Sequence, residues 1–430
     1  MTTQPHDLLT KEPILPRPAA PMPQRDPLTI CMLAYAFYES DTRIMQYAEA
    51  LARRGDTVEV IALRRDRSFP EVELLRGVKV FRIQERTVNE TGLLTYITRI
   101  LRFFLRSALF LYRRQRVRSC DLVHVHNVPD FLVFAAIAAK LQRIPILLDI
   151  HDLLPEFYAS KFKISHNTAL FRILTFIERC SAGFATHVIV ANHLWCDRLA
   201  ARSSHPRKCS VVRNRPDLSI FSGKHSSPPA THSGRFLFTY PGSLNWHQGV
   251  DVAIRAFASI ADRIPDADFH IYGEGSAKPS LIHLTHQLGM DERILFHDFL
   301  PSRDIARVMA TTDLAIEPKR STSAFGNEAL STKILEFMSL GVPVIASRTR
   351  IHAFYYDQSI IQYYDHDDEF ALAGQMLRLK KDPVLRARLA ENASQHAKEN
   401  TWDVCKQEYL DLVDSFAIPN LATARHPSHT

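Results

Sequence analysis

Short apolar runs recur along the whole chain, and most are followed by segments with the periodicity of an amphipathic helix. Apolar runs that alternate with helical segments predict a parallel β-sheet with helices on both faces. The predicted strands of the first half are residues 28–34, 57–63, 78–83, 121–127, 144–151, 187–192 and 209–214. Those of the second half are 236–242, 268–275, 294–300, 314–318 and 342–347.

The two sets of strands are separated by residues 222–234, SGKHSSPPATHSG, whose composition is typical of a linker. We therefore predict two doubly wound α/β domains. Open parallel sheets bind ligands beyond the carboxyl ends of their strands, so a site is expected in the cleft between the two sheets. The predicted division is a Pro-rich tail at 1–26, a first domain at 27–220, a linker at 221–234, a second domain at 235–400, a final helix at 401–417 and a tail at 418–430.

The composition is that of a globular protein, with 46% hydrophobic and 23% charged residues among 430. The six cysteines are scattered and form no CxxC pair, which favours reduced thiols in the cytosol over disulfides or a zinc site. No signal peptide is recognisable at the N-terminus. The formal charge of +7 suggests an anionic partner, either nucleic acid or a membrane surface.

The segment most suited to bind such a partner is 95–118, TYITRILRFFLRSALFLYRRQRVR. On a helix, Arg99, Arg102, Arg106 and Arg113 fall within an arc of about 60°, and the other positions are mainly Ile, Leu and Phe. Arginines within the apolar run disfavour a spanning helix. We expect a helix that lies on an anionic membrane surface, although a soluble helix packed on the first sheet has the same pattern. No nucleic-acid-binding motif is present, so nucleic acid is not an expected partner.

The stretch 328–347, EALSTKILEFMSLGVPVIAS, carries the most chemical information. A helix is expected over 332–340, with Glu328 in the loop before it, Lys333 in its first turn and Glu336 on its body. A helix N-terminus with a lysine binds phosphate, and carboxylates accept hydrogen bonds from hydroxyl groups. The pattern therefore favours a phosphorylated, hydroxyl-rich ligand such as a sugar nucleotide.

The order of these residues resembles the donor-site signature of family 4 of the retaining glycosyltransferases, and a second match lies at DIHDLLPE, residues 149–156. The resemblance covers about residues 28–415. It implies the α/β GT-B fold, in which two facing Rossmann-like domains bind acceptor (27–220) and donor (235–400), and the last helix crosses back to the first domain. It also implies a retaining transfer from a nucleotide-sugar to a saccharide or lipid-linked acceptor, without a metal or other cofactor, in bacterial polysaccharide or glycolipid synthesis at the cytoplasmic face of the plasma membrane.

Site residues follow from matching motifs and from strand ends. His151, at the end of a predicted strand, matches the family histidine that contacts the donor sugar, although a structural histidine suits that position too. Glu328 matches a glutamate near the donor sugar, and Glu336 one that accepts from the ribose. The predicted catalytic residues are His151, Glu328 and Lys333. The predicted donor-binding residues are Gly242, Ser243, Gln248, Gly273, Lys319, Gly326, Asn327 and Glu336, and those on the acceptor side are Asp41, Arg43 and His126.

Two departures from the family pattern open alternatives. The turn after the first strand, AFYESDTR, contains no glycine, and Asp41 or Thr42 could equally cap a helix there. In the loop 242–249, Ser243 and Gln248 stand where many members carry Arg and Lys, which shifts diphosphate binding onto Lys333 with the helix start at Ser331. Lys319 and Arg320, just after the predicted strand 314–318, are expected near the same ligand, although a solvated loop suits them equally. The alternatives are a non-catalytic scaffold that binds a sugar nucleotide and a sugar-nucleotide epimerase on the same fold.

Overall fold

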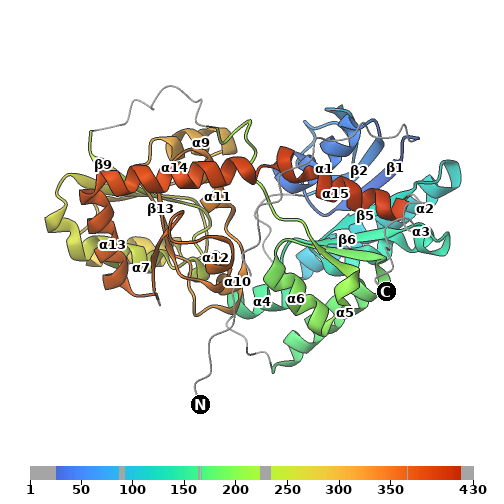
Figure 1. Ribbon diagram of the computed structural model, residues 1–430. Coiled ribbons are helices and arrows are strands. Elements are labelled where there is room, and N and C mark those ends of the chain that lie inside the picture. Colours follow the sequence, from blue (N-terminus) through green and yellow to red (C-terminus); the bar gives the residue numbers. More distant parts are fainter. Residues whose placement is uncertain are drawn as a thin grey trace, which may run out of the picture.

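The computed structural model describes residues 26–86, 93–162, 165, 167–222, 234–365 and 367–417. The predicted tails and linker lie almost entirely outside these ranges. The described chain forms two α/β lobes, each built around one mainly parallel sheet (Figure 1), which confirms the predicted fold class. None of the described helices combines the length and the apolar character needed to cross a membrane.

The first lobe contains an eight-stranded sheet of order β3-β4-β2-β1-β5-β6-β7-β8. Only the β3–β4 pair is antiparallel. The sequence did not predict β3, whose residues are half-buried or exposed at the sheet edge. The strands are β1 Thr29–Ala34, β2 Thr57–Arg64, β3 Val72–Leu75, β4 Val78–Glu85, β5 Leu122–His126, β6 Ile146–Ile150, β7 His187–Val190 and β8 Cys209–Val211.

Helices cover both faces of this sheet (Figure 1). The Ala-rich segment between β5 and β6 forms a 3-10 helix, η2, followed by a short α-helix, α3. The α-helices are α1 Thr42–Arg53, α2 Leu93–Val117, α3 Ile137–Leu141, α4 Leu154–Phe162, α5 Ala169–Phe184 and α6 His193–Arg202, and the 3-10 helices are η1 Tyr38–Ser40, η2 Asp130–Ala136 and η3 Pro206–Lys208.

The second lobe contains a parallel six-stranded sheet of order β11-β10-β9-β12-β13-β14, of which only β14 was not predicted. Its strands are β9 Phe236–Pro241, β10 Ala267–Tyr272, β11 Ile294–His297, β12 Leu314–Glu317, β13 Val344–Ser347 and β14 Gln362–Tyr364. Its helices are η4 Trp246–Gln248, α7 Val250–Ile260, η5 Ala261–Arg263, α8 Lys278–Gln287, α9 Ser302–Ala310, α10 Ala324–Glu328, α11 Thr332–Ser339, α12 Arg350–Tyr355, α13 Glu369–Lys381 and α14 Pro383–Glu399.

The C-terminal helices connect the lobes. Figure 1 shows α14 on the second lobe leading into α15, Trp402–Ala417, on the first. On the inner face of α15, Tyr409 stacks on Tyr47 of α1 with ring centroids 4.0 Å apart, and its hydroxyl lies 3.0 Å from His124 Nδ1. This helix therefore completes the core of the first lobe.

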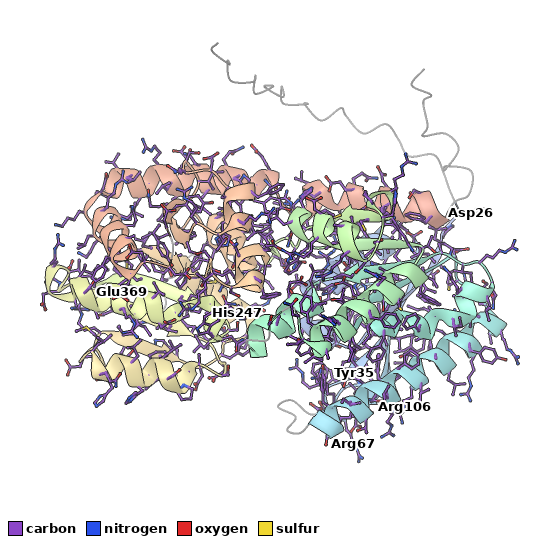
Figure 2. All side chains as sticks on the ribbon, turned by 90° about the horizontal axis from the view of Figure 1, so that it is seen from below. Asp26, Tyr35, Arg67, Arg106, His247 and Glu369 are labelled. Atoms are coloured by element: carbon purple, nitrogen blue, oxygen red, sulfur yellow. The ribbon has the colours of Figure 1, made fainter. Side chains whose placement is uncertain are left out.

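The two lobes also meet directly along α10. Phe325 and Ala329 of the second lobe are buried within the apolar core of the first, where Phe325 contacts Phe157 and Trp195. His247, at the junction of the lobes in Figure 2, packs edge-on against the same phenylalanine. The carboxyl ends of the two sheets are thus held around one shared region.

Candidate active site

A cavity of about 540 Å³ lies beyond the carboxyl ends of β9 and β10, with Lys333 and Glu336 of α11 on one side. Its walls are mainly apolar and include Tyr272, Phe299 and Leu300. This volume falls in the range of roughly 300–1,000 Å³ typical of small-molecule sites. Five of the predicted donor-site residues line it together: Gly242, Ser243, Gly273, Lys333 and Glu336.

Glycines let two backbone loops meet at the cavity mouth. Gly273 has φ +137°, and a Cβ atom there would lie 1.9 Å from the carbonyl oxygen of Gly242. A Cβ at Gly275 would lie 2.3 Å from the carbonyl oxygen of Leu244. Side chains are thus excluded from both positions, and the loop after β10 can pack backbone to backbone against the loop after β9.

Lys333 is fixed inside the cavity by a buried carboxylate. Its Nζ lies 3.0 Å from Glu317 Oε2, and it donates to the Tyr240 hydroxyl at 3.2 Å. Burial disfavours the ammonium, but Glu317 outweighs that cost and raises the pKa of Lys333 above its ordinary value. The lysine therefore presents a fixed positive charge to the cavity at neutral pH.

Glu317 and Tyr240 were missed by the sequence interpretation. The available signal was a charged residue at the carboxyl end of the otherwise apolar strand Leu314–Glu317, a position that reaches the ligand edge of a parallel sheet. Burial disfavours the Glu317 carboxylate, but Lys333 and Lys319 outweigh it and hold its pKa below the ordinary value. Glu317 is thus the anion that positions Lys333.

Glu336 lies one turn further along α11 and faces the same cavity. Burial raises the pKa of its carboxyl to about 7, against the opposing effect of Lys333. An ionised carboxylate here can accept two hydroxyl hydrogen bonds, as ribose recognition requires. Glu336 therefore accepts two hydroxyl hydrogen bonds above neutral pH and loses this ability as it gains a proton below neutral pH.

The N-terminus of α11 offers further groups to an anion. Ser331 is the N-cap residue, but its side chain makes no capping hydrogen bond. Within the part of the chain that the structure describes, the buried Ser331 hydroxyl and Gln248 Oε1 have no hydrogen-bond partner. Neither residue lines the cavity itself, so these two atoms are polar groups near the helix start that can still take a hydrogen bond.

The other predicted donor residues, Gln248, Lys319, Gly326 and Asn327, are not among those that line the cavity. Lys319 is buried and donates to the carbonyl oxygen of Ala329 at 2.8 Å, and burial lowers its pKa to about 8. A Cβ at Gly326 would lie 2.7 Å from the Arg320 carbonyl oxygen, and Asn327 accepts from the backbone N–H of Arg350. Arg320, expected near the ligand, is instead bound by Asp251 through both carboxylate oxygens.

Glu328 ends α10 instead of lying in a loop, and it connects the lobes. Arg198 of α6 donates to both of its carboxylate oxygens, at 2.9 and 2.6 Å, and Arg350 approaches at 3.1 Å. Asn192 of the first lobe also donates to the Glu328 carbonyl oxygen. The structure thus gives this carboxylate an interdomain ion pair, while its predicted sugar contact stays a prediction.

Across the junction, His151 follows β6 and belongs to a buried network centred on Asp149, which the sequence interpretation also missed. His151 Nε2 and His126 Nδ1 lie 3.0 and 3.1 Å from Asp149 Oδ2, and Arg43 donates to both oxygens of this carboxylate. Burial opposes the charge on Asp149, but Arg43 outweighs it and keeps the pKa well below its ordinary value. Asp149 in turn offsets burial and raises the pKa of His151.

This network also contains two of the residues predicted on the acceptor side. Arg43 and His126 are buried and contact Asp149, so the structure shows them as supports of the network, and their contact with an acceptor stays a prediction. Asp41 caps α1, where its carboxylate accepts from the backbone N–H of Ile44 at 3.1 Å. His151 is partly exposed, with 18% of its side-chain surface accessible, whereas Arg43 and His126 are buried.

His124, His126 and Asp149 are the three described residues whose ligating atoms come close enough, within 4.8 Å, to hold a metal ion. Both carboxylate oxygens of Asp149 already hold Arg43, and His124 Nδ1 lies next to the Tyr409 hydroxyl. A metal ion there would sit against the buried guanidinium. We therefore interpret this group as a hydrogen-bond network that supports His151.

The chain matches two family models that together span most of both lobes. Residues 40–215 match the glycosyl transferase 4-like domain, and residues 224–396 match the glycosyl transferases group 1. Among curated proteins, it is 23% identical over 405 residues to D-inositol 3-phosphate glycosyltransferase of Corynebacterium glutamicum, covering 89% of this chain and 93% of that one. It is 26% identical over 245 residues to sulfoquinovosyl transferase of Arabidopsis thaliana; the match covers 53% of this chain and 42% of that protein.

Solved structures share the whole architecture. Sucrose-phosphate synthase from Thermosynechococcus elongatus superposes with a TM-score of 0.72 at 17% identity, over 92% of this chain and 100% of that one. The Anabaena protein HepE, solved with UDP and glucose, superposes with a TM-score of 0.69 at 18% identity, over 90% of this chain and 100% of that one. These similarities confirm the predicted GT-B fold. The chain therefore belongs to the family 4-like, group 1 glycosyltransferases.

Proposed function

We propose that the chain transfers a glycosyl group from a nucleotide-sugar to a hydroxyl of a saccharide or lipid-linked acceptor, with retention of configuration, in bacterial polysaccharide or glycolipid synthesis. The observation that carries the proposal is the cavity beyond β9 and β10, where Lys333 is fixed by Glu317 beside the N-terminus of α11. The UDP and UDP-glucose named with HepE support a nucleotide-sugar donor.

In the proposed reaction, the bond between the sugar C1 and the diphosphate breaks while the acceptor hydroxyl oxygen bonds to C1 on the same face. The hydroxyl proton passes to the departing phosphate oxygen. Lys333 and the backbone N–H groups of α11 stabilise the charge that develops on the diphosphate, which is the main electrostatic requirement of the step. Because these groups supply the positive charge, the proposal needs no metal ion.

We assign His151, on the other lobe, to the sugar of the donor. Its raised pKa and its hydrogen bond to Asp149 keep the ring oriented and able to donate to a sugar hydroxyl. Glu336, as a carboxylate, would accept from the ribose hydroxyls. The two lobes would thus bind opposite ends of one donor molecule.

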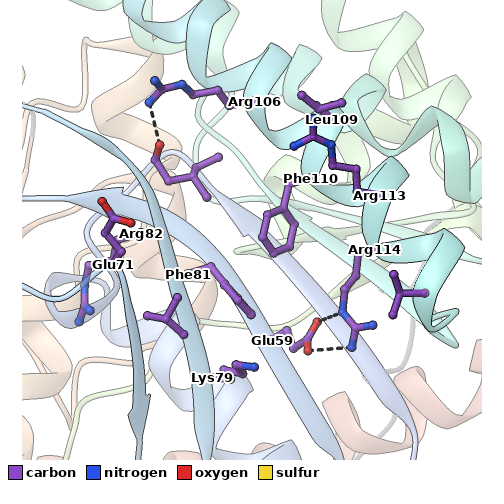
Figure 3. Close-up of a pocket in the computed structure, with 13 residues that line it drawn as sticks. Glu59, Glu71, Lys79, Phe81, Arg82, Arg106, Leu109, Phe110, Arg113 and Arg114 are labelled. Atoms are coloured by element: carbon purple, nitrogen blue, oxygen red, sulfur yellow. Dashed lines mark hydrogen bonds and ion pairs between the residues drawn. The ribbon is translucent and has the colours of Figure 1, made fainter.

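We also propose that the protein lies on the anionic cytoplasmic face of the plasma membrane through α2. Leu101, Leu105 and Leu109 repeat every four residues on one face and are exposed, while exposed Arg102 and Arg113 flank them. Figure 3 shows Arg113 and Leu109 extending from this helix. A helix with such a face binds anionic lipid headgroups.

Not every arginine of the predicted stripe is available to lipid. Figure 3 shows that Arg106 donates to the Ile83 carbonyl oxygen and that Arg114 pairs with Glu59. Reversing charge at Arg102 and Arg113 should abolish sedimentation with vesicles that contain phosphatidylglycerol, and 0.5 M salt should weaken wild-type binding. Equal sedimentation of wild type and this variant would refute the membrane proposal.

The transfer proposal is tested by incubating the protein with UDP-, GDP- and ADP-sugars and measuring both binding and nucleotide release. Wild type should bind one donor and release its nucleoside diphosphate. The His151→Ala variant should bind that donor but release its nucleoside diphosphate about 10²-fold more slowly than wild type. Binding without release would assign the scaffold function, and conversion to an isomeric nucleotide-sugar without acceptor would assign an epimerase.

A further inference from the structure

A second cavity, of about 610 Å³, forms a groove between α2 and α5 on the first lobe. Ile100 and Leu101 of α2 line one side, Leu174 and Ile177 of α5 line the other, and Val128 and Leu154 lie among the residues at its base. One carboxyl group, that of Asp130, borders the groove, and it accepts a hydrogen bond from Asn127 Nδ2. The groove therefore offers a ligand almost exclusively hydrocarbon surface.

The rim of the groove is also apolar and faces solvent. Among the residues that line it, Ile97 and Leu101 on α2 are 43% and 47% exposed, and Leu170 on α5 is 45% exposed. Large apolar side chains grouped in this way mark a binding surface more often than a solvated one. An open groove with an almost wholly apolar lining matches the hydrocarbon chain of an amphiphile.

The base of the groove belongs to the loops that hold His151. Asn127 accepts from the backbone N–H of His151 at 2.8 Å and donates to Asp130 and to the Asp152 carbonyl oxygen. The next residue, Val128, lines the groove. Helix α4 contributes Leu154 to the groove, and Phe157 of the same helix contacts the donor lobe. A chain bound in the groove would therefore end near the sugar-binding side of the junction.

We propose that the groove binds the hydrocarbon chain of a lipid-linked acceptor, so that the acceptor is drawn from a membrane and is not a free saccharide. This inference rests on the proposed glycosyl transfer and specifies its acceptor. The apolar groove holds the chain, and the acceptor hydroxyl extends toward His151.

The test is a titration of the donor-free protein with octyl phosphate, decyl phosphate and inorganic phosphate, all below micelle-forming concentrations. Each buried methylene strengthens binding about fourfold, or ~0.8 kcal/mol, so decyl phosphate should bind about 15-fold more tightly than octyl phosphate. Inorganic phosphate should bind far more weakly than either. Two rim substitutions made together, Leu101→Glu and Leu170→Glu, should remove the dependence on chain length, because both side chains are about half-exposed and line the groove.

Val384→Glu is the matched control, since Val384 is 77% exposed on α14 of the other lobe and should leave binding unchanged. Equal affinity for both alkyl phosphates, or unchanged binding by the rim variant, would overturn the proposal. A dimer in solution that the rim variant dissociates would assign the groove to a second copy of the chain and overturn it too. Glu336 lines the other cavity, so the Glu336→Gln variant should bind the alkyl phosphates with the same dependence on chain length as wild type. The titration contains no donor, so its outcome does not depend on whether the protein transfers a sugar.

Discussion

Replacing Lys333 with methionine should affect stability and catalysis for two different reasons. The change leaves the buried Glu317 carboxylate without the ammonium that lies 3.0 Å away. Breaking a buried ion pair costs about 3–5 kcal/mol, and the lower value is expected because Lys319 also stabilises Glu317. For a domain of this size, about 3 kcal/mol corresponds to a fall in melting temperature of roughly 6–12 °C. Loss of the fixed cation should also lower kcat about 10²–10³-fold.

A double variant separates the two effects. Adding Glu317→Gln to Lys333→Met removes the unpaired charge but does not restore the cation, so stability should return to within about 1 kcal/mol of wild type while kcat stays low. Thermal unfolding and nucleotide release from the donor are the two measurements. A single variant with kcat within tenfold of wild type, or a double variant that regains turnover, would refute the assigned role of Lys333.

Three further predictions concern the same two lobes. Binding of a nucleotide-sugar should weaken about tenfold as pH falls from 8 to 6, because the Glu336 carboxyl, with a pKa of about 7, gains a proton and no longer accepts two hydroxyl hydrogen bonds. The Glu336→Gln variant should bind the donor equally at both pH values; an unchanged pH dependence in this variant would contradict the assignment. Gly273→Ala should weaken donor binding at least tenfold by calorimetry, whereas Gly289→Ala, where φ is +66° and no atom lies within 4 Å of the added Cβ, should leave it unchanged. Asp149→Asn should lower the free energy of unfolding by about 3 kcal/mol in urea, because Arg43 is left buried without a carboxylate; a loss below about 1 kcal/mol would show that this ion pair is not needed for stability.

Sequence pattern was sufficient to predict the architecture. The interior strands of both sheets are continuous apolar runs, so their positions followed directly from hydropathy. The missed strands β3 and β14 are short edge strands, and β3 alternates between exposed and half-buried residues. Strand β3 buries little apolar surface, and β14, although its two tyrosines are buried, has only three residues, which is too short to give a clear pattern.

The cavity beyond β9 and β10 was predictable for a related reason. Gly242, Gly273, Lys333 and Glu336 lie at strand ends or in a helix start, where position along the chain fixes position at the sheet edge. The partners Glu317 and Asp149 were not predicted, because a single carboxylate in an apolar strand does not identify the cation it binds. Those cations, Lys333 and Arg43, come from distant segments, and only the folded chain brings them together.

The same limit applies to helix α2. The helical period of its sequence predicted an apolar face and a stripe of arginines, but it could not show that Arg114 forms an ion pair with Glu59. It also could not reveal the groove, since one wall comes from α5, more than 60 residues later in the chain. Features made by two helices require the structure.

We propose that this protein moves a sugar from a nucleotide with retention of configuration. The most direct measurement is proton NMR of a reaction that contains the nucleotide-sugar selected by binding and a lipid-linked acceptor, followed in real time. We predict that nucleoside diphosphate and glycoside appear together, with the product anomeric coupling constant matching that of the donor. An inverted anomer, or donor that binds and remains intact, would contradict it.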